Sequence, residues 1–357
     1  MSTPVPPTSC SACQEPVPDG ARFCEACGAP LDATAATGPA PVAAPAAATA
    51  ATAPAATAPA AAPVARPCVG CGAPPEQIGA DRYCQVCGRK QPAPHDHEEL
   101  VLPGIVAVTD RGRTHHRNED AYACGVADGA VVVMVCDGVS STADSDRAAI
   151  DASAAGREHA LRALAAGEPV AGAARGAIAA AQAAAAAVPP STGDTASCTA
   201  VFAVARRVDP RTWHAAVAWL GDSRAYLLRS YMLRGESLEQ LTVDHSWATE
   251  QIASGMAPAE AFADPRCHSI TRWLGADAVD TEPSVRELEI VQGDVLVVVS
   301  DGLWNYAPDD DAMAALLAEQ ALGEAARPVT IEQARALVEF ANEQGGQDNI
   351  TVAIAKF

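Results

Sequence analysis

The stretch that decides the fold is Val295-Leu-Val-Val-Val-Ser-Asp-Gly-Leu-Trp304, in which five apolar residues run into a serine, an aspartate and a glycine. Such a run predicts a buried strand. A similar order recurs at Val131-Val-Val-Met-Val-Cys-Asp-Gly138. Each stretch therefore places one carboxylate, Asp137 or Asp301, just past the end of a strand.

Further apolar runs around these two predict a mixed α/β domain from about residue 100 onward. The predicted strands include residues 131–135, 201–204, 217–220, 295–299 and 350–354. Helical spacing of apolar residues predicts helices at 146–166, 171–187, 310–322 and 330–344. Strands outnumber helices and do not alternate strictly with them, which favours a layered α+β fold over a doubly wound parallel sheet.

Two more acidic groups stand at the ends of predicted strands. Glu119 and Asp120 precede Ala121-Tyr-Ala123, and Asp348 precedes the last strand. Carboxylates at strand ends can converge on one rim of a sheet, where hard divalent cations take oxygen ligands. Without cations such a cluster would repel itself. A single Asp-Gly is more often a simple turn signal, so the metal interpretation depends on the whole set.

The composition narrows the class of function. The chain has 357 residues and a formal net charge of −20, which argues against a nucleic-acid partner. Aromatic residues make up 4%, too few for base-stacking surfaces. The most apolar run, residues 170–188, is interrupted by Arg175 and Gln182, and the first seven residues lack the pattern of a secretory signal. We therefore expect a cytoplasmic protein with no membrane segment.

Composition also divides the N-terminal part of the chain. Residues 1–32 and 67–92 each hold four cysteines, and residues 33–66 between them are almost entirely Ala, Pro and Thr. That stretch buries too little surface to fold, and its prolines prevent a continuous helix, so we expect an extended linker. A short polar joint, residues 92–99, leads into the main domain at 100–357.

The cysteine spacing predicts two structural zinc sites. Each set holds two Cys-x-x-Cys pairs, separated by ten residues in the first set and twelve in the second. Four thiolates complete a tetrahedron around Zn²⁺ and fill its coordination shell, so neither site is expected to be catalytic. Gly28, Gly72 and Gly88 follow second cysteines, where a tight turn needs a permissive backbone. The predicted ligands are Cys10, Cys13, Cys24 and Cys27 in the first set and Cys68, Cys71, Cys84 and Cys87 in the second.

Other uses of paired cysteines fit less well. Thioredoxin-like chemistry places one Cys-x-x-Cys at a helix start inside a larger fold, and a disulfide scaffold needs an oxidising compartment. An alternative within the zinc interpretation builds each site from both cysteine sets. The two sets resemble the paired zinc-ribbon modules at the ends of many prokaryotic regulatory proteins. On their linker, we expect them to dock a kinase, a substrate or a scaffold.

Residues 104–357 carry six motifs that resemble those of the type 2C, metal-dependent protein phosphatases, in the same order. They are Asp110-Arg-Gly-Arg-Thr-His-His-Arg-Asn-Glu-Asp120, Val135-Cys-Asp-Gly138, Leu220-Gly-Asp-Ser-Arg-Ala-Tyr-Leu227, Leu241-Thr-Val-Asp-His-Ser246, Val299-Ser-Asp-Gly-Leu-Trp304 and Gly345-Gly-Gln-Asp-Asn-Ile-Thr-Val352. The resemblance implies a four-layer α-β-β-α sandwich, with two antiparallel sheets flanked by helices and a two-metal site at one edge.

The resemblance also implies which residues bind two Mn²⁺ or Mg²⁺ ions. The residue matching Asp137 bridges both ions, and the one matching Gly138 gives its carbonyl. Asp301 and Asp348 match the residues that complete the shell of one ion. The pair Glu119-Asp120 matches the residues that serve the other ion, partly through water.

Two further features follow from the resemblance. Asp222 matches a residue linked to a third, weaker metal, and residues 244–275 match the variable flap beside the active site. The implied reaction is hydrolysis of phosphoserine or phosphothreonine in proteins by a metal-activated water, which reverses the action of a Ser/Thr kinase. The alanine- and proline-rich composition suggests a bacterium with a GC-rich genome.

The chain departs from the family pattern near the predicted phosphate site. His115 stands where the family usually has a phosphate-binding arginine, with Arg113 and Arg117 close by. A histidine lacks the guanidinium fork, so His115 either binds phosphate or donates a proton, or it is a rim residue and a nearby arginine compensates. Ser140-Ser141 replaces a common Gly-Gly, and Asp146 stands where glutamate is usual.

Three rival functions remain at this point. A catalytically silent relative would bind phosphoproteins only, although such proteins generally lose metal ligands and this chain keeps every expected acidic position. A nucleic-acid-binding regulator would need a basic face, and residues 1–92 contain only scattered Arg and Lys. A small phosphate ester as substrate is the third, and the protein-phosphatase motifs weigh against it.

Overall fold

The computed structural model describes residues 67–79, 82–191, 193–229, 237–322 and 327–357, together with two short strands near the N-terminus. Those strands, β1 (Thr8–Ser9) and β2 (Pro16–Val17), pair in antiparallel fashion. The first cysteine set (Cys10, Cys13, Cys24 and Cys27) and the predicted linker lie outside the described residues. The chain forms two compact units, 1–64 and 65–357, and the second contains both large sheets.

Two antiparallel sheets form the body of the second unit. The first has the strand order β11-β10-β14-β15-β4-β3, and the second has the order β13-β9-β8-β6-β5. The strands of the first sheet are β3 (His97–Leu102), β4 (Ile105–Asp110), β10 (Arg224–Arg229), β11 (Ser237–Gln240), β14 (Val295–Val299) and β15 (Ile350–Lys356). Those of the second are β5 (Ala121–Ala127), β6 (Ala130–Cys136), β8 (Ala200–Asp209), β9 (Thr212–Leu220) and β13 (Ser284–Val291).

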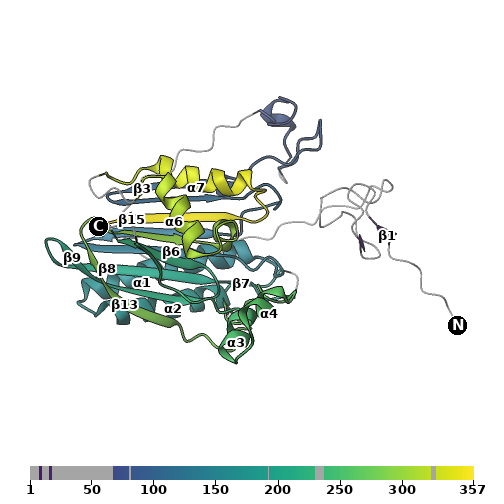
Figure 1. Cartoon of the computed structure of the whole chain (residues 1–357). Helices are drawn as coiled ribbons and strands as arrows, with labels where there is room; N and C mark the ends of the chain where they lie inside the picture. The colour runs from purple at the N-terminus through teal and green to yellow at the C-terminus, as the bar shows by residue number, and fades with distance from the viewer. Residues whose placement is uncertain are drawn as a thin grey trace, which may run out of the picture. The chain divides into compact units, whose positions relative to one another are not determined.

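Helices lie on the outer face of each sheet (Figure 1). The helices on the second sheet are α1 (Ser145–Ala165) and α2 (Val170–Ala186), and those on the first are α5 (Asp301–Trp304), α6 (Asp310–Glu319) and α7 (Ile331–Glu343). Between β11 and β13 lie α3 (Trp247–Ala253), α4 (Pro258–Ala263) and β12 (Leu274–Gly275), the last paired with β7 (Ser197–Cys198). Among the described helices, none has the length and apolar character needed to cross a bilayer.

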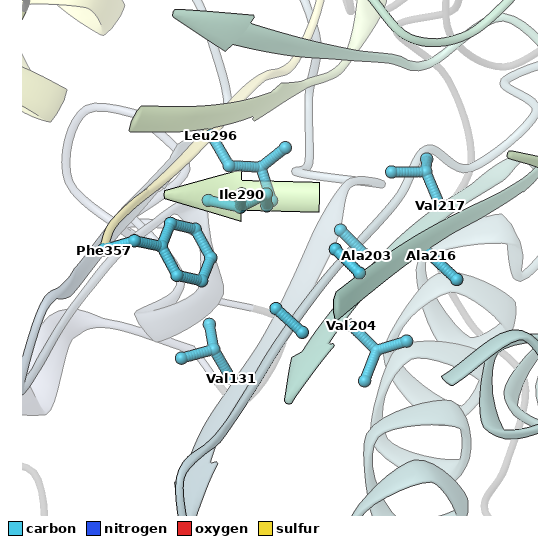
Figure 2. A pocket seen from close by; sticks show the side chains of 10 residues that line it. Val131, Ala203, Val204, Ala216, Val217, Ile290, Leu296 and Phe357 are labelled. Carbon is cyan, nitrogen blue, oxygen red and sulfur yellow. The ribbon is translucent and has the colours of Figure 1, made fainter. Parts of the chain in front are cut away.

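Apolar side chains fill three layers, because neighbouring residues of a strand point to opposite faces. In β8, Ala203 lies between the two sheets, whereas Val204 packs toward α1 and α2. Figure 2 shows side chains at one part of the sheet-to-sheet layer, where Ile290, Leu296 and Phe357 lie close together. The expected pair of antiparallel sheets with helices outside them is therefore confirmed, with the described cysteine set ahead of it.

The apolar periodicity located the interior elements well. All five predicted strands fall within β6, β8, β9, β14 and β15, and the four predicted helices match α1, α2, α6 and α7 to within three residues at each end. Asp301 does not simply follow β14: it is the first residue of the short helix α5. The predicted polar joint also has regular structure, because η2 (Pro94–Asp96) and the start of β3 lie in it.

Gly302 permits the close approach of α5 to the start of β15. A Cβ atom at this position would lie 1.9 Å from the backbone oxygen of Asn349. Any larger residue would therefore push apart the two segments that carry Asp301 and Asp348.

We expect Gly302→Ala to destabilise the main domain by about 1–3 kcal/mol or more, the usual cost of overpacking. Gly172→Ala is the control, because an added Cβ there would meet nothing closer than 3.8 Å and alanine favours helix by up to about 1 kcal/mol. Urea unfolding of the full chain measures both. Equal stability of the two variants would contradict the packing described here.

Candidate metal centre

Strand register brings the predicted acidic residues to one edge of the sandwich. In the second sheet Ala121 pairs with Cys136, so the residues just before β5 lie beside those just after β6. In the first sheet Val299 pairs with Val352, which places the end of β14 beside the start of β15. The two edges meet where Ser300 Oγ donates to Asp120 Oδ2 at 2.7 Å. Residues from four strand ends therefore share one region.

Desolvation and electrostatic repulsion raise the pKa values of three carboxyl groups in this region. Removal from water, followed by the charge of Asp348, raises the pKa of Asp301 to about 7. Burial likewise raises the pKa of Asp120 to about 7, against the hydrogen bond from Ser300. Desolvation and the charge of Asp120 raise the pKa of Asp137 well above its usual range. A divalent cation among these groups would remove the repulsion.

Within the described residues, the acidic groups do not form a closed coordination shell. Across the described ranges, the only groups of three or more ligand atoms lying within 4.8 Å of one another belong to cysteines. Open carboxylate sites of this kind suit Mg²⁺ and similar hard cations, which keep several bound waters. The donor set therefore fits divalent cations that are partly coordinated by water.

Glu119 is held by more hydrogen bonds than its neighbours. Its Oε1 accepts from Arg117 Nη2 at 2.7 Å and from Ser145 Oγ at 2.6 Å, and its Oε2 accepts from Ser140 Oγ at 2.8 Å. Its backbone N–H donates to Asn349 Oδ1 at 2.7 Å, which ties this segment to the start of β15. Glu119 is therefore fixed in place, and the sequence analysis did not anticipate the part played by Ser140.

Gly138 packs directly against Glu119. Its backbone N–H donates to the Glu119 carbonyl at 3.1 Å, and a Cβ atom at Gly138 would lie 2.6 Å from that same oxygen. The close approach of these two backbone segments thus requires a glycine at position 138.

The three phosphate-binding candidates occupy different surroundings. His115 lies between two carboxylates, with Nε2 3.2 Å from Asp348 Oδ1 and Nδ1 3.8 Å from Glu119 Oε2. Arg117 pairs with Glu119 and lies 3.5 Å from Asp146, so it is occupied by acidic groups. The side chain of Arg113 is exposed.

Asp222 lies on the side of the site nearest the predicted flap. It is 7% exposed, and burial followed by the charges of Asp301 and Asp244 raises its pKa well above the usual range. Its backbone carbonyl accepts from Trp304 Nε1 at 2.9 Å. Asp222 is therefore close enough to Asp301 for the two carboxylates to repel each other electrostatically.

Two side chains fasten the start of the predicted flap, residues 244–275, to the body. Arg224 donates to Asp244 at 2.7 Å, and its guanidinium lies 3.7 Å from the centre of the Trp304 ring. His245 Nδ1 accepts from the backbone N–H of Gly221 at 3.2 Å. Burial, then the charge of Arg272, lowers the pKa of His245 to about 4, so it is neutral at pH 7 and free to accept this bond.

A second cluster, of four thiols, lies in residues 67–92. Cys68 Sγ is 3.6 Å from Cys87 Sγ, and Cys71 Sγ is 3.7 Å from Cys84 Sγ. Sulfurs 2.3 Å from a central Zn²⁺ in a tetrahedron lie about 3.8 Å apart, so the spacing fits one zinc ion. All four belong to the second cysteine set, and this cluster needs no cysteine of the first. Gly72 and Gly88 adopt positive φ values, as the turn argument expects.

Comparison with known families identifies two regions. A sequence model described as Protein phosphatase 2C matches residues 109–340. Another, described as Double zinc ribbon, matches residues 10–88.

Individual proteins similar to this chain are also described as protein phosphatases. Protein phosphatase PhpP of Streptococcus pneumoniae is 35% identical over 138 residues, which are 38% of this chain and 50% of that protein. The chain thus spans about half the length of the curated relatives it matches.

Solved structures cover more of the fold. The serine/threonine phosphatase PstP/Ppp of Mycobacterium tuberculosis is 25% identical, with a TM-score of 0.52 over 71% of this chain and 97% of that one. The PPM Ser-Thr phosphatase MsPP of Mycobacterium smegmatis, solved with cacodylate, is 26% identical, with a TM-score of 0.52 over 72% and 100%.

The raised pKa values predict that, without divalent cations, the protein loses stability as pH rises. When folding raises the pKa of a carboxyl group, its contribution to stability is fully present at any pH below its unfolded-state pKa of about 4. That contribution disappears as pH passes the folded-state pKa, about 7 for Asp120 and Asp301. We expect the Tm in chelator to fall from about pH 5 to about pH 7.5, and saturating Mn²⁺ to remove most of the fall.

Asp137→Asn removes one charge from the cluster and should reduce this pH-dependent fall. Asp128→Asn makes the same change in the exposed turn at the far end of the β5–β6 hairpin and should leave the fall unchanged. Thermal unfolding in chelator at both pH values measures the effect. An identical fall in the two variants would show that the cluster does not cause it.

Proposed function

This chain belongs to the protein phosphatase 2C family, and we propose that it hydrolyses phosphoserine and phosphothreonine in proteins with the help of two divalent cations. The observation that carries the proposal is the convergence of Asp120, Asp137, Asp301 and Asp348 at one edge, where burial and then mutual repulsion raise the pKa values of the first three. Four carboxylates crowded in this way favour bound Mn²⁺ or Mg²⁺.

The chain's own residues would hold the cations in a defined order. We assign the bridging position to Asp137 with the Gly138 carbonyl, one ion to Asp301 and Asp348, and the other to the pair Glu119-Asp120. Asp222 would serve a third, weaker cation. When bound, the two main cations supply an activated water and neutralise charge on the phosphoryl oxygens.

The surrounding residues fix the orientation of the proposed cation ligands. Ser300 orients Asp120, and Asn305 Nδ2 donates to Asp301 Oδ2 at 3.2 Å. Arg117, Ser140 and Ser145 hold Glu119. These bonds reduce the reorganisation needed when cation and substrate bind.

His115 is assigned the role of proton donor to the departing serine or threonine oxygen. Its Nε2 lies 3.2 Å from Asp348, at the rim of the cation site, and its ring is 25% exposed. Carboxylates on both sides oppose binding of a phosphate dianion by the ring. The exposed Arg113 is the better candidate for contact with phosphate.

The second cysteine set would bind one structural Zn²⁺, and the first set a second Zn²⁺, as the spacing and the Double zinc ribbon match support. We propose that the ribbons dock a Ser/Thr kinase, a substrate or a scaffold. The cytoplasmic location and the absence of a nucleic-acid partner stay predictions from composition.

The direct test is phosphate release from phosphoserine, phosphothreonine and phosphotyrosine peptides with Mn²⁺, Mg²⁺ or chelator. We expect cation-dependent activity on the first two peptides. Asp137→Asn should lower kcat on the order of 10³-fold, because metal ions contribute several kcal/mol to the transition state. Asp128→Asn is the control. Tight phosphopeptide binding without turnover would instead support the catalytically silent alternative.

The proton-donor role of His115 predicts different effects on two substrates. His115→Ala should lower kcat for a phosphothreonine peptide by about 10²-fold with little change in KM. Activity on p-nitrophenyl phosphate should be nearly unchanged, because its leaving group needs no proton. A raised KM for both substrates would indicate phosphate binding, and unchanged kcat and KM would leave His115 with no part in catalysis.

A further inference from the structure

The joint between the thiol cluster and the main domain makes direct contact with the segment that carries two proposed cation ligands. The joint, predicted at residues 92–99, is considered together with Lys90 and Gln91 just before it, and the segment comprises residues 116–120. The sequence analysis treated the joint as a polar connection only. In the structure it has side-chain hydrogen bonds at both of its ends.

At the cluster end, Gln91 binds a zinc-ligand candidate. Its Nε2 donates to Cys68 Sγ at 3.3 Å, and its Oε1 accepts from the backbone N–H of Val69 at 2.9 Å. Gln91 is 9% exposed, and its backbone forms a bond in each direction with Arg82. The start of the joint is thus part of the cluster's own structure.

At the other end of the joint, His95 forms hydrogen bonds with the segment 116–120, which carries the two proposed cation ligands. Its Nε2 donates to the backbone carbonyl of Asp120 at 2.8 Å, and its own carbonyl accepts from Asn118 Nδ2 at 3.0 Å. Its Nδ1 lies 3.1 Å from Glu98 Oε1, which orients the ring. Asn118 and Asp120, on either side of Glu119, are therefore both fixed by one residue of the joint.

Two further bonds run beside this contact. Lys90 Nζ donates to the His116 carbonyl at 3.3 Å, and the backbone N–H of Arg111 donates to the Asp96 carbonyl at 2.8 Å. Asp96 Oδ2 in turn accepts from the backbone N–H of Ala93, which closes the turn η2. The three residues between Gln91 and His95 are therefore held in a compact turn and do not form a free tether.

We infer that Gln91 and His95 are positioning residues that couple the Cys68 cluster to the proposed catalytic cations. Zinc orders Cys68 and hence Gln91. The compact turn then places His95, which holds the backbone on both sides of Glu119. Because coupling between two binding sites is reciprocal, zinc should raise the affinity for Mn²⁺ and Mn²⁺ should raise the affinity for zinc. The catalytic identity of the Mn²⁺ site rests on the proposed function.

The test is Mn²⁺ affinity of the zinc-loaded full chain, measured by calorimetry and by the electron paramagnetic resonance signal of free Mn²⁺. His95→Ala should raise the Kd about five- to tenfold, near the low end of the cost of losing a partner of a metal-ligand segment. His95→Gln keeps a donor where Nε2 lies and should stay within about twofold of wild type. Val86→Ser, in an exposed position of the same cysteine set, should have no effect.

Removal of the proposed zinc ligands tests whether the Cys68 cluster influences Mn²⁺ binding. Cys84→Ala/Cys87→Ala should weaken Mn²⁺ binding about as much as His95→Ala, and adding His95→Ala to it should cost little more. A main-domain unfolding transition like that of wild type, in chelator, shows that this variant is folded; if it is not, Gln91→Ala replaces it.

The outcomes separate the two claims. Any of three results would overturn the coupling and leave the proposed function standing. The first is an unchanged Mn²⁺ affinity in His95→Ala, and the second is an equal loss of Mn²⁺ affinity in His95→Ala and His95→Gln. The third is a loss of Mn²⁺ affinity in His95→Ala that adds in full to the loss caused by the cysteine variant. A wild-type protein that binds no Mn²⁺ would overturn both.

Discussion

The desolvation and mutual repulsion of crowded carboxylates is the constraint on which the rest of this structure depends. The fold brings Asp120, Asp137 and Asp301 together at the edge where two sheets meet, although each would be more stable apart in water. Strand register holds them there, and hydrogen bonds from Ser300 and Asn305 orient two of them. The apolar layers between and outside the sheets provide the stability that offsets this repulsion. In the proposed function, bound cations complete the arrangement.

The sequence predicted the interior of the fold more closely than its borders. Runs such as Val131–Val135 are buried on both faces, so their composition alone identifies them. In contrast β3, His97-Glu-Glu-Leu-Val-Leu102, is a partly exposed edge strand whose two acidic residues conceal its character. The acidic residues of the proposed site could be named from the sequence because each adjoins a predicted strand and matches a family motif.

The hydrogen bonds around the site could not be predicted in the same way. Asn349 Oδ1 accepts from the backbone of Glu119 across 230 residues of sequence, and nothing local marks that pairing. From the sequence, Ser140 is only part of a Ser-Ser pair that replaces a common Gly-Gly, whereas in the structure its hydroxyl donates to Glu119. His95 lies in a short polar stretch, and its contact with Asp120 depends on the direction in which η2 turns the chain.

The central claim is that acidic residues from distant parts of the chain bind a pair of hard cations and so activate water toward a phosphoester. A crystal grown with Mn²⁺ and measured at the manganese absorption edge tests it most directly. The account predicts two anomalous peaks about 3.5–4 Å apart, both in contact with Asp137 and one of them also with Asp301 and Asp348. Clear density for these three side chains with no ion among them would contradict it.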